Sequence, residues 1–141
     1  MNNELKIKMY SFTIDCKEPN DLAKFYANLM DWEIVYSDDN WAVVGAPGTK
    51  QGQYPGILFQ KNLEYVKPVW PAKKDYQQQM AHLDFGVNDL DLSIKHALEC
   101  GATIARDQFD SNQKVMLDPE GHPFCLCLMT ELINTDDFSL R

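Results

Sequence analysis

The chain contains one small structural unit twice, and this repeat limits the folds that are open to it. Residues 11–30 read SFTIDCKEPNDLAKFYANLM, and residues 82–101 read HLDFGVNDLDLSIKHALECG. An offset of 71 residues places Ser11 on His82. A shorter match, at an offset of 65, joins GILFQ from Gly56 to GHPFC from Gly121. A repeated unit of this kind indicates a pseudo-symmetric protein, with its site in the groove between the halves.

The spacing of apolar residues predicts a strand and then a helix at the start of the first half. Phe12, Ile14 and Cys16 alternate with polar residues, which is the pattern of a half-buried strand. Pro19 stands where the first turn of a helix accepts proline, and apolar residues at helical spacing follow it. We expect the remaining strands of this half at residues 32–37, 40–46 and 56–60.

The second half repeats this plan and marks both ends of its helix. Asp89 is suited to the N-cap and Gly101 to a left-handed end, so we expect a helix over residues 90–100. We expect strands at residues 80–87, 102–107, 113–117 and 123–129, with a turn at DPEG before the last one. About eight strands and two main helices predict the α+β class. Because two helices cover only one sheet face, the other face is left to line a site.

Size, charge and cysteine content narrow the class of protein. A chain of 141 residues, 45% of them hydrophobic, is expected to form one domain with a buried core. Acidic residues outnumber basic ones by 21 to 13, and the net charge of −8 argues against nucleic acid and anionic membranes as partners. The charge suits a cationic or neutral small molecule. The four cysteines form no CxxC pair and the N-terminus has no apolar signal core, so we expect a cytoplasmic protein.

Alternation along the strands predicts which side chains line the open face of the sheet. We expect one set to pack under the helices: Phe12, Phe59, Leu83, Phe85, Phe124 and Leu126. We expect a smaller and more polar set on the open face: Ser11, Thr13, Asp15, Leu58, Gln60, His82, Asp84, Met116, Cys125 and Cys127. His82 and Asp84 stand two residues apart, hence about 6–7 Å apart along one strand.

The open face allows several kinds of chemistry. His82, Gln60 and Cys125 could hold a divalent metal, because imidazole and thiolate suit zinc and the late transition metals. His82 could equally be a pocket histidine that binds no metal, and Cys125 and Cys127 small packing residues. Asp84 could be a solvated acid, a hydrogen-bond partner of a loop, or one half of an acid–base pair with His82.

Four segments together resemble the vicinal oxygen chelate superfamily, which includes glyoxalase I, bleomycin resistance proteins, fosfomycin resistance enzymes and extradiol dioxygenases. These segments are KFYANLMDW (residues 24–32), HLDFGVNDLDLSI (82–94), ECGAT (99–103) and DPEGHPFCLCL (118–128). The similarity covers roughly residues 10–129 and is strongest to the glyoxalase-like domains. It implies two pseudo-symmetric βαβββ modules that form a curved mixed sheet around a cleft, and it implies a homodimer.

The resemblance also implies where a metal would bind. Metal-binding members draw ligands from the first and last strand of each module, and the matching positions here are Ser11, Gln60, His82 and Cys125. His82 and Gln60 are residue types used at such sites, whereas Ser11 is a poor ligand and Cys125 stands where metal-binding members have Glu. We therefore expect either no cofactor or a weakly bound divalent metal (Zn, Ni, Mn or Fe).

Two functions remain open on the sequence alone. The first is a metal-free protein that binds a small molecule in the cleft, as bleomycin resistance proteins do. Its expected ligand contacts are Thr13, Asp15, Trp41, Asp84, Met116 and Cys127, with stacking on Trp41, Trp70 or Tyr54. The second is a divalent-metal-dependent lyase, isomerase or dioxygenase acting on adjacent substrate oxygens, with His82 as the catalytic residue and Gln60, His82 and Cys125 as ligands.

The expected single domain, residues 1–141, divides into modules and connecting segments. We place module one at about residues 8–60, a connector at 61–79, module two at about 80–129 and a tail at 130–141. The connector carries Tyr65, Trp70 and Tyr76, which either form an ordered flap or pack on the outer surface. The acidic tail is either a frayed helix or disordered.

Overall fold

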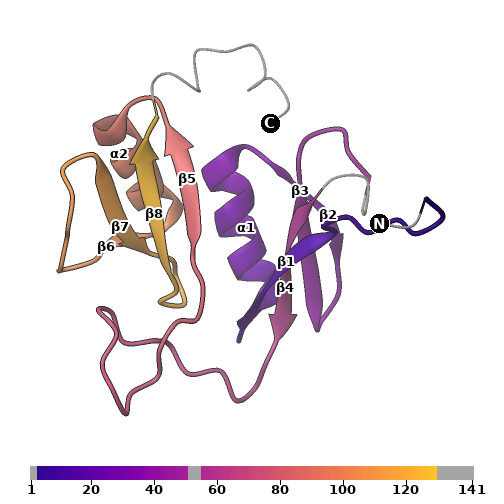
Figure 1. The fold of residues 1–141 in the computed structure, drawn as a ribbon, viewed down its shortest axis with the longest axis horizontal. Coiled ribbons are helices and arrows are strands. Elements are labelled where there is room, and N and C mark those ends of the chain that lie inside the picture. Colours follow the sequence, from indigo (N-terminus) through magenta and orange to yellow (C-terminus); the bar gives the residue numbers. More distant parts are fainter. Residues whose placement is uncertain (1–2, 51–54, 130–141) are drawn as a thin grey trace.

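Each half of the chain folds as a βαβββ module, as the repeat predicts (Figure 1). The computed structural model describes residues 3–50 and 55–129, so the predictions for Tyr54 and for the tail fall outside the described residues. Module one contains β1 (Ser11–Cys16), α1 (Pro19–Met30), β2 (Glu33–Ser37), β3 (Trp41–Gly45) and β4 (Gly56–Lys61). Module two contains β5 (Leu83–Val87), α2 (Leu90–Cys100), β6 (Thr103–Ile104), β7 (Gln113–Leu117) and β8 (Pro123–Leu128).

The described strands form two four-stranded mixed sheets that do not close into a barrel. Their orders are β1-β4-β3-β2 and β5-β8-β7-β6. In each module the first strand runs parallel to the last one, and the last one runs antiparallel to the strand before it. The α+β class and the pair of similar modules are therefore confirmed, and β1 and β5 each lie at an edge of a sheet.

The ends of the helices follow the local signals. Pro19 occupies the first position of α1, and Asp31 ends this helix in the left-handed conformation with φ 56°. The side chain of Asp89 accepts the Leu92 N–H at 2.9 Å, and Gly101 ends α2 with φ 119°. The predicted N-cap, C-terminal residue and bounds of α2 are all confirmed.

Two strands of module two are shorter than the sequence predicts. β5 begins at Leu83, where Leu83 pairs with Phe124. One residue earlier the partner would be Pro123, which has no N–H to donate to the ladder. β6 covers only two residues. Beyond Ile104, the side chain of Gln108 accepts from the Val115 N–H and donates to the Val115 and Ala105 carbonyls, in place of main-chain pairing by a longer β6.

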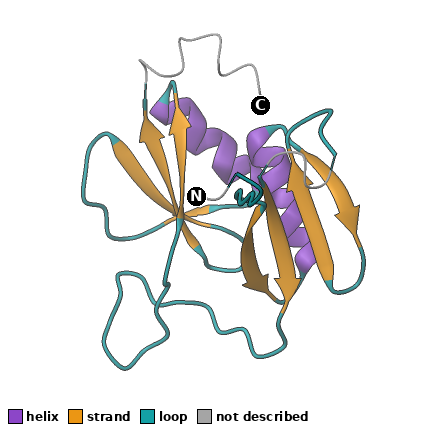
Figure 2. Cartoon of the chain, turned by 45° about the vertical axis from the view of Figure 1, so that its right-hand side comes forward, coloured by secondary structure: helices purple, strands orange, loops and turns teal. Residues whose placement is uncertain are grey.

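One hydrophobic core joins the two modules, and both helices lie between the sheets (Figure 2). The ring of Tyr26 on α1 stacks on Phe59 of module one at 5.5 Å between centroids and meets Phe124 of module two at 6.1 Å. All six residues expected under the helices belong to this core or pack against it: Phe12, Phe59, Leu83, Phe85, Phe124 and Leu126.

The expected position of Met116 on the open face is wrong. Met116 is fully buried in the shared core and pairs with Phe124, which points to the same side of the sheet. Its neighbour Val115 instead pairs with Cys125 and lies in a second, smaller cluster. The side chains of β7 therefore point to the opposite faces from those that the sequence predicted.

Candidate functional site

A cleft of about 430 Å³ lies where the two modules and the connector meet. This volume is within the range of small-molecule sites, about 300–1,000 Å³. β1, α1, the connector, the start of β5 and the turn before β8 all contribute to its wall. Polar and aromatic members of the lining include Thr13, Asp15, Tyr26, Asn62, Glu64, Tyr65, Gln77, Gln78, Gln79, His82 and His122.

The cleft lining contains two carboxylates and two histidines, His82 and His122. Asp15 and Glu64 are acidic, and no lysine or arginine is among the described residues that line it. Asn62 donates a hydrogen bond to the Asp15 carboxylate at 3.2 Å, which fixes this acid at the cleft wall. The side-chain oxygen of Gln79 is buried without a hydrogen-bond partner among the described residues. The lining therefore offers acceptors to a ligand that carries donors.

The cleft brings together three of the predicted site residues. Thr13, Asp15 and His82 line it, whereas Trp41, Gln60 and Cys127 are outside its lining. Trp41 and Gln60 pair with each other at the end of the β3–β4 ladder. Cys127 packs beside the second cluster on the open face of module two.

His82 also belongs to a group of possible metal ligands at the edge of the cleft. The ligand atoms of His82, Asp84 and Cys125 lie within 4.8 Å of one another. Register explains the grouping: Asp84 pairs with Cys125 across β5 and β8, and the Nε2 atom of His82 is 3.2 Å from an Asp84 carboxylate oxygen. Cys125 is 7% exposed, and burial, aided by the charge of Asp84, raises the pKa of its thiol to about 11.

The sequence match at an offset of 65 made Gln60 the counterpart of Cys125, and the sheet register changes this assignment. β1 and β5 correspond at the offset of 71, so Asp84 corresponds to Thr13, and Thr13 pairs with Leu58. Leu58, not Gln60, is therefore the module-one counterpart of Cys125. A ligand role for Gln60 stays a prediction, and Asp84 is the residue that the structure places beside His82 and Cys125.

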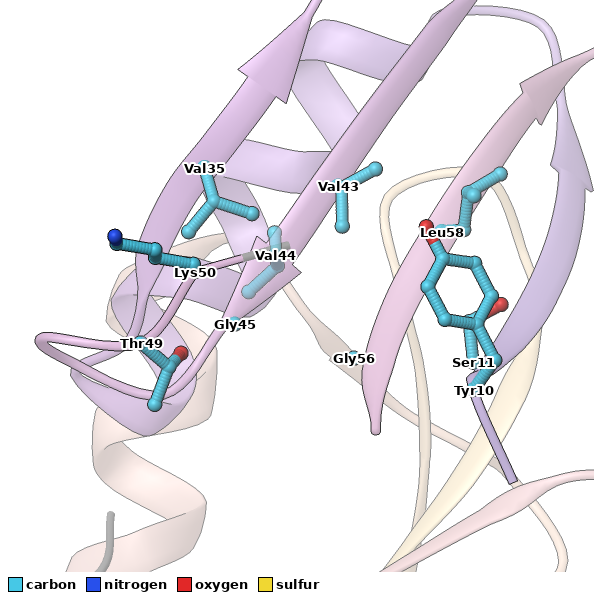
Figure 3. Close-up of a pocket in the computed structure, with 10 residues that line it drawn as sticks. All are labelled: Tyr10, Ser11, Val35, Val43, Val44, Gly45, Thr49, Lys50, Gly56 and Leu58. Carbon is cyan, nitrogen blue, oxygen red and sulfur yellow. The ribbon is translucent and has the colours of Figure 1, made fainter. Parts of the chain in front are cut away.

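The part of the module-one open face that carries Ser11 and Leu58 offers little room. A pocket there has a volume of only about 10 Å³, which is about the space of one water molecule. In Figure 3, the apolar side chains of Val35, Val43 and Leu58 lie along this face, with Ser11 and Tyr10 at one end. The positions that would complete a metal site across both modules thus carry a hydroxyl and an alkyl group, and the group of three possible ligands found among the described residues lies in module two.

Two aromatic residues of the connector pack against module two. Trp70 packs against the cluster of Ala105, Val115 and Cys125, so it covers the open face beside the possible metal ligands. The indole nitrogen of Trp70 is buried without a partner among the described residues. Tyr65 contacts the His122 ring at 4.9 Å between centroids. Tyr65 and Trp70 therefore pack against module two, and a role of the connector as a flap stays a prediction.

A buried polar network that sequence reasoning missed forms the back wall of the cleft. Tyr26 donates a hydrogen bond to Asp118 at 2.7 Å, and the Nδ1 atom of His122 is 2.8 Å from the same carboxylate. Asp118 is 4% exposed. The DPEGH sequence carries a signal for the Asp118–His122 pair, since a turn brings these residues together, but nothing local points to Tyr26.

The fold and the cleft define a protein of the vicinal oxygen chelate class, with paired βαβββ modules and a ligand-sized cavity where they meet. The family model described as "Glyoxalase-like domain" matches residues 11–127, and the chain belongs to this family. No curated protein matches the sequence. In the described part of the chain, no helix is long and apolar enough to cross a membrane.

Solved structures share the fold at low sequence identity. A glyoxalase/bleomycin resistance protein/dioxygenase family enzyme from Burkholderia phytofirmans PsJN is 16% identical, with a TM-score of 0.59 over 83% of this chain and 94% of that chain. The trypanothione-dependent glyoxalase I of Leishmania major is 14% identical, with a TM-score of 0.59 over 95% of each chain. A glyoxalase family protein from Enterococcus faecalis is 14% identical, with a TM-score of 0.61 over 85% of this chain and 96% of that chain. Such identities establish the fold and leave the reaction open.

Proposed function

We propose that the chain binds a small cationic or neutral organic molecule in the cleft between its modules, without needing a metal ion. The observation that carries this proposal is the cleft of about 430 Å³, in which Thr13, Asp15 and His82 meet the connector. Because Asp15 and Glu64 face no lysine or arginine in the described lining, a bound cation gains favourable electrostatic energy there.

The test is a thermal-shift screen of cationic, neutral and anionic small molecules in the presence of a chelator. A ligand at 100 times its Kd should stabilise the fold by about 2.7 kcal/mol. For a cationic compound that binds, His82→Ala should weaken binding about tenfold and leave the unfolding free energy within about 0.5 kcal/mol of wild type. His96→Ala, on α2 and outside the cleft lining, is the control for loss of an imidazole; because its ring contacts the main-chain oxygens of Asn28 and Leu29, its unfolding free energy is measured beside its affinity.

A second experiment tests whether the acidic residues of the lining select for a cation. The double variant Asp15→Asn, Glu64→Gln should lose affinity for the cationic compound but keep its affinity for a neutral one. A screen in which no compound raises the Tm in chelator would reject metal-free binding. Unfolding of His82→Ala in the absence of any ligand would instead assign this residue a structural role.

A metal-dependent reaction is the second candidate, favoured by the His82, Asp84 and Cys125 group. An imidazole, a carboxylate and a thiolate form a donor set that suits zinc and related divalent ions. An ion held there would polarise adjacent oxygens of a substrate bound in the cleft. Cys125 must lose its proton to bind a metal, so affinity should rise with pH below the thiol pKa of about 11.

Metal content separates the two candidates. Protein purified without chelator should hold near-stoichiometric metal if the second is right, and Asp84→Asn or Cys125→Ser should abolish it. Cys127→Ser, two residues further along β8, is the control. Absence of metal, together with no rise in Tm on adding Zn, Ni, Co or Mn, would reject metal dependence.

We also infer a homodimer that works in the cytoplasm with a small molecule, and neither nucleic acid nor membrane, as its partner. The resemblance to the superfamily supports the dimer, and the edge positions of β1 and β5 leave strands to which a second copy could add. The net charge of −8 supports the choice against nucleic acid. Light scattering on the purified chain should give twice the 16.2 kDa mass, and the monomer mass would refute the dimer.

A further inference from the structure

The back wall of the cleft contains one histidine whose ring joins three parts of the chain. The Nδ1 atom of His122 lies 2.8 Å from the Asp118 carboxylate, in the turn between β7 and β8. Its Nε2 atom lies 2.7 Å from the main-chain oxygen of Asp15 on β1. Its ring faces Tyr65 of the connector at 4.9 Å, and the Tyr65 hydroxyl donates to the Glu120 carbonyl at 2.8 Å.

Both ring nitrogens of His122 face acceptors. The Asp15 oxygen is a carbonyl and can only accept a hydrogen bond. The two oxygens of Asp118 already accept from Tyr26 and from the main-chain N–H groups of Glu120 and His122, as an ionised carboxylate does. A neutral imidazole has one N–H and would turn a lone pair toward one of these acceptors. The geometry therefore favours the doubly protonated ring.

The electrostatic surroundings agree with this geometry. Burial lowers the pKa of His122, but the hydrogen bond to Asp118 and the charge of its carboxylate outweigh burial and raise the pKa above its ordinary value. The backbone oxygen of Asp15 and the charge of Glu120 act in the same direction. The titratable groups around the ring, taken from every packed element, are Asp118, Glu120, Tyr26, Tyr65, Lys67, Cys16 and Asp15.

We propose that His122 is a positively charged clasp that holds β1, the β7–β8 turn and the connector together, so that the cleft keeps its shape only while both ring nitrogens carry a proton. Loss of one proton breaks either the link to module one or the link to Asp118, and the connector, whose Tyr65 ring contacts the His122 ring, loosens. The effect on ligand binding rests on the proposed function, whereas the clasp does not.

The sign of the pH dependence follows from the charged form being favoured in the fold. A histidine with a raised pKa stabilises the folded protein at low pH, and this contribution is lost as pH rises through the folded-state value. The clasp should therefore be closed below the ordinary histidine pKa of about 6.5 and should open as pH rises through the higher folded-state pKa. A cleft ligand should bind best when the clasp is closed.

The first test is nuclear magnetic resonance of the full chain with ¹⁵N-labelled histidine, in which the signals are assigned by His82→Gln and His96→Gln. At pH 6, both ring nitrogens of His122 should give imidazolium signals, and the titration midpoint should lie above that of an exposed histidine. Signals of a neutral ring at pH 6, or a midpoint at or below that of an exposed histidine, would overturn the proposal. This measurement keeps His122 in place, so it tests the proposal even if His122 variants do not fold.

The second test measures release of the connector by trypsin at Lys73 and Lys74 between pH 6 and 9, normalised to a small peptide substrate. Cleavage of the wild type and of the control His96→Gln should increase about fivefold across this range, whereas His122→Gln should be cleaved rapidly throughout. Parallel profiles of wild type and His122→Gln would overturn the clasp. The two proposals can fail separately. If both tests confirm the clasp but no compound in the thermal-shift screen binds, the proposed function is refuted and the clasp is not.

Discussion

Replacing Tyr26 by Phe tests whether the buried network that joins the modules contributes to stability. The Tyr26 side chain is 1% exposed and its hydroxyl donates to Asp118 at 2.7 Å. The Phe ring fills the same space, so the contact with Phe59 at 5.5 Å between centroids persists and no cavity forms. What is lost is one hydrogen bond to a buried carboxylate, which costs about 1–3 kcal/mol because that carboxylate cannot turn to water instead.

Urea unfolding monitored by circular dichroism measures this loss directly. For a chain of 141 residues, about 1–3 kcal/mol corresponds to a fall in Tm of roughly 3–9 °C. Tyr36→Phe is a matched control, since its hydroxyl donates to Asp38 at 2.5 Å on the exposed surface, where water replaces the lost bond. We expect no measurable loss for Tyr36→Phe. Equal stabilities for the two variants would refute the argument that burial makes the Tyr26 bond count.

Two further changes test local features. Asp89→Ala removes the acceptor of the Leu92 N–H and should lower the free energy of unfolding by about 0.5–2 kcal/mol, while Asp89→Ser should restore most of it; an unchanged urea midpoint for Asp89→Ala would show that the cap is dispensable. Trp70→Ala should speed alkylation of Cys125 by iodoacetamide, because the thiol loses its cover and part of the burial that raises its pKa to about 11. Mass spectrometry of the labelled peptide gives the rate, and a rate equal to that of wild type would show that Trp70 does not protect the thiol.

Features that depend on nearest neighbours could be predicted from the sequence. The ends of α2 follow from Asp89 and Gly101, each of which acts on the main chain within a few residues. The two-module plan follows from the repeat of strand and helix patterns. These signals are local, so no knowledge of the packed structure was needed to read them.

The phase of β7 could not be predicted, because its sequence does not alternate. Val115, Met116 and Leu117 are all apolar, so either phase leaves apolar side chains on both faces. The register with β8 decides, and it pairs Met116 with Phe124 in the core. A similar ambiguity affected Gln60, since the sequence match at an offset of 65 keeps every side chain on the correct face and still misses the register by two residues.

The missed network depends on contacts between residues far apart in the chain. Asp118 and Tyr26 are 92 positions apart, and His122 and Asp15 are 107 apart. The sequence places Asp118 and His122 in one turn, but only packing of module two against α1 and β1 supplies their partners. For the same reason, the cover that Trp70 provides for Cys125 could be suggested by the composition of the connector but not assigned to a face.

The two modules share a fold but not a chemistry, and this asymmetry decides which variants are informative. Corresponding positions carry His82 and Asp84 in module two but Ser11 and Thr13 in module one. Among the described residues, the only group of three possible metal ligands therefore lies in module two, beside the cluster that Trp70 covers. His82 alone belongs to both the cleft lining and the possible metal ligands, so its removal impairs either proposed function. Asp84 is outside the cleft lining, so Asp84→Asn should abolish metal binding under the second proposal and should leave metal-free binding in place under the first, which separates the two functions.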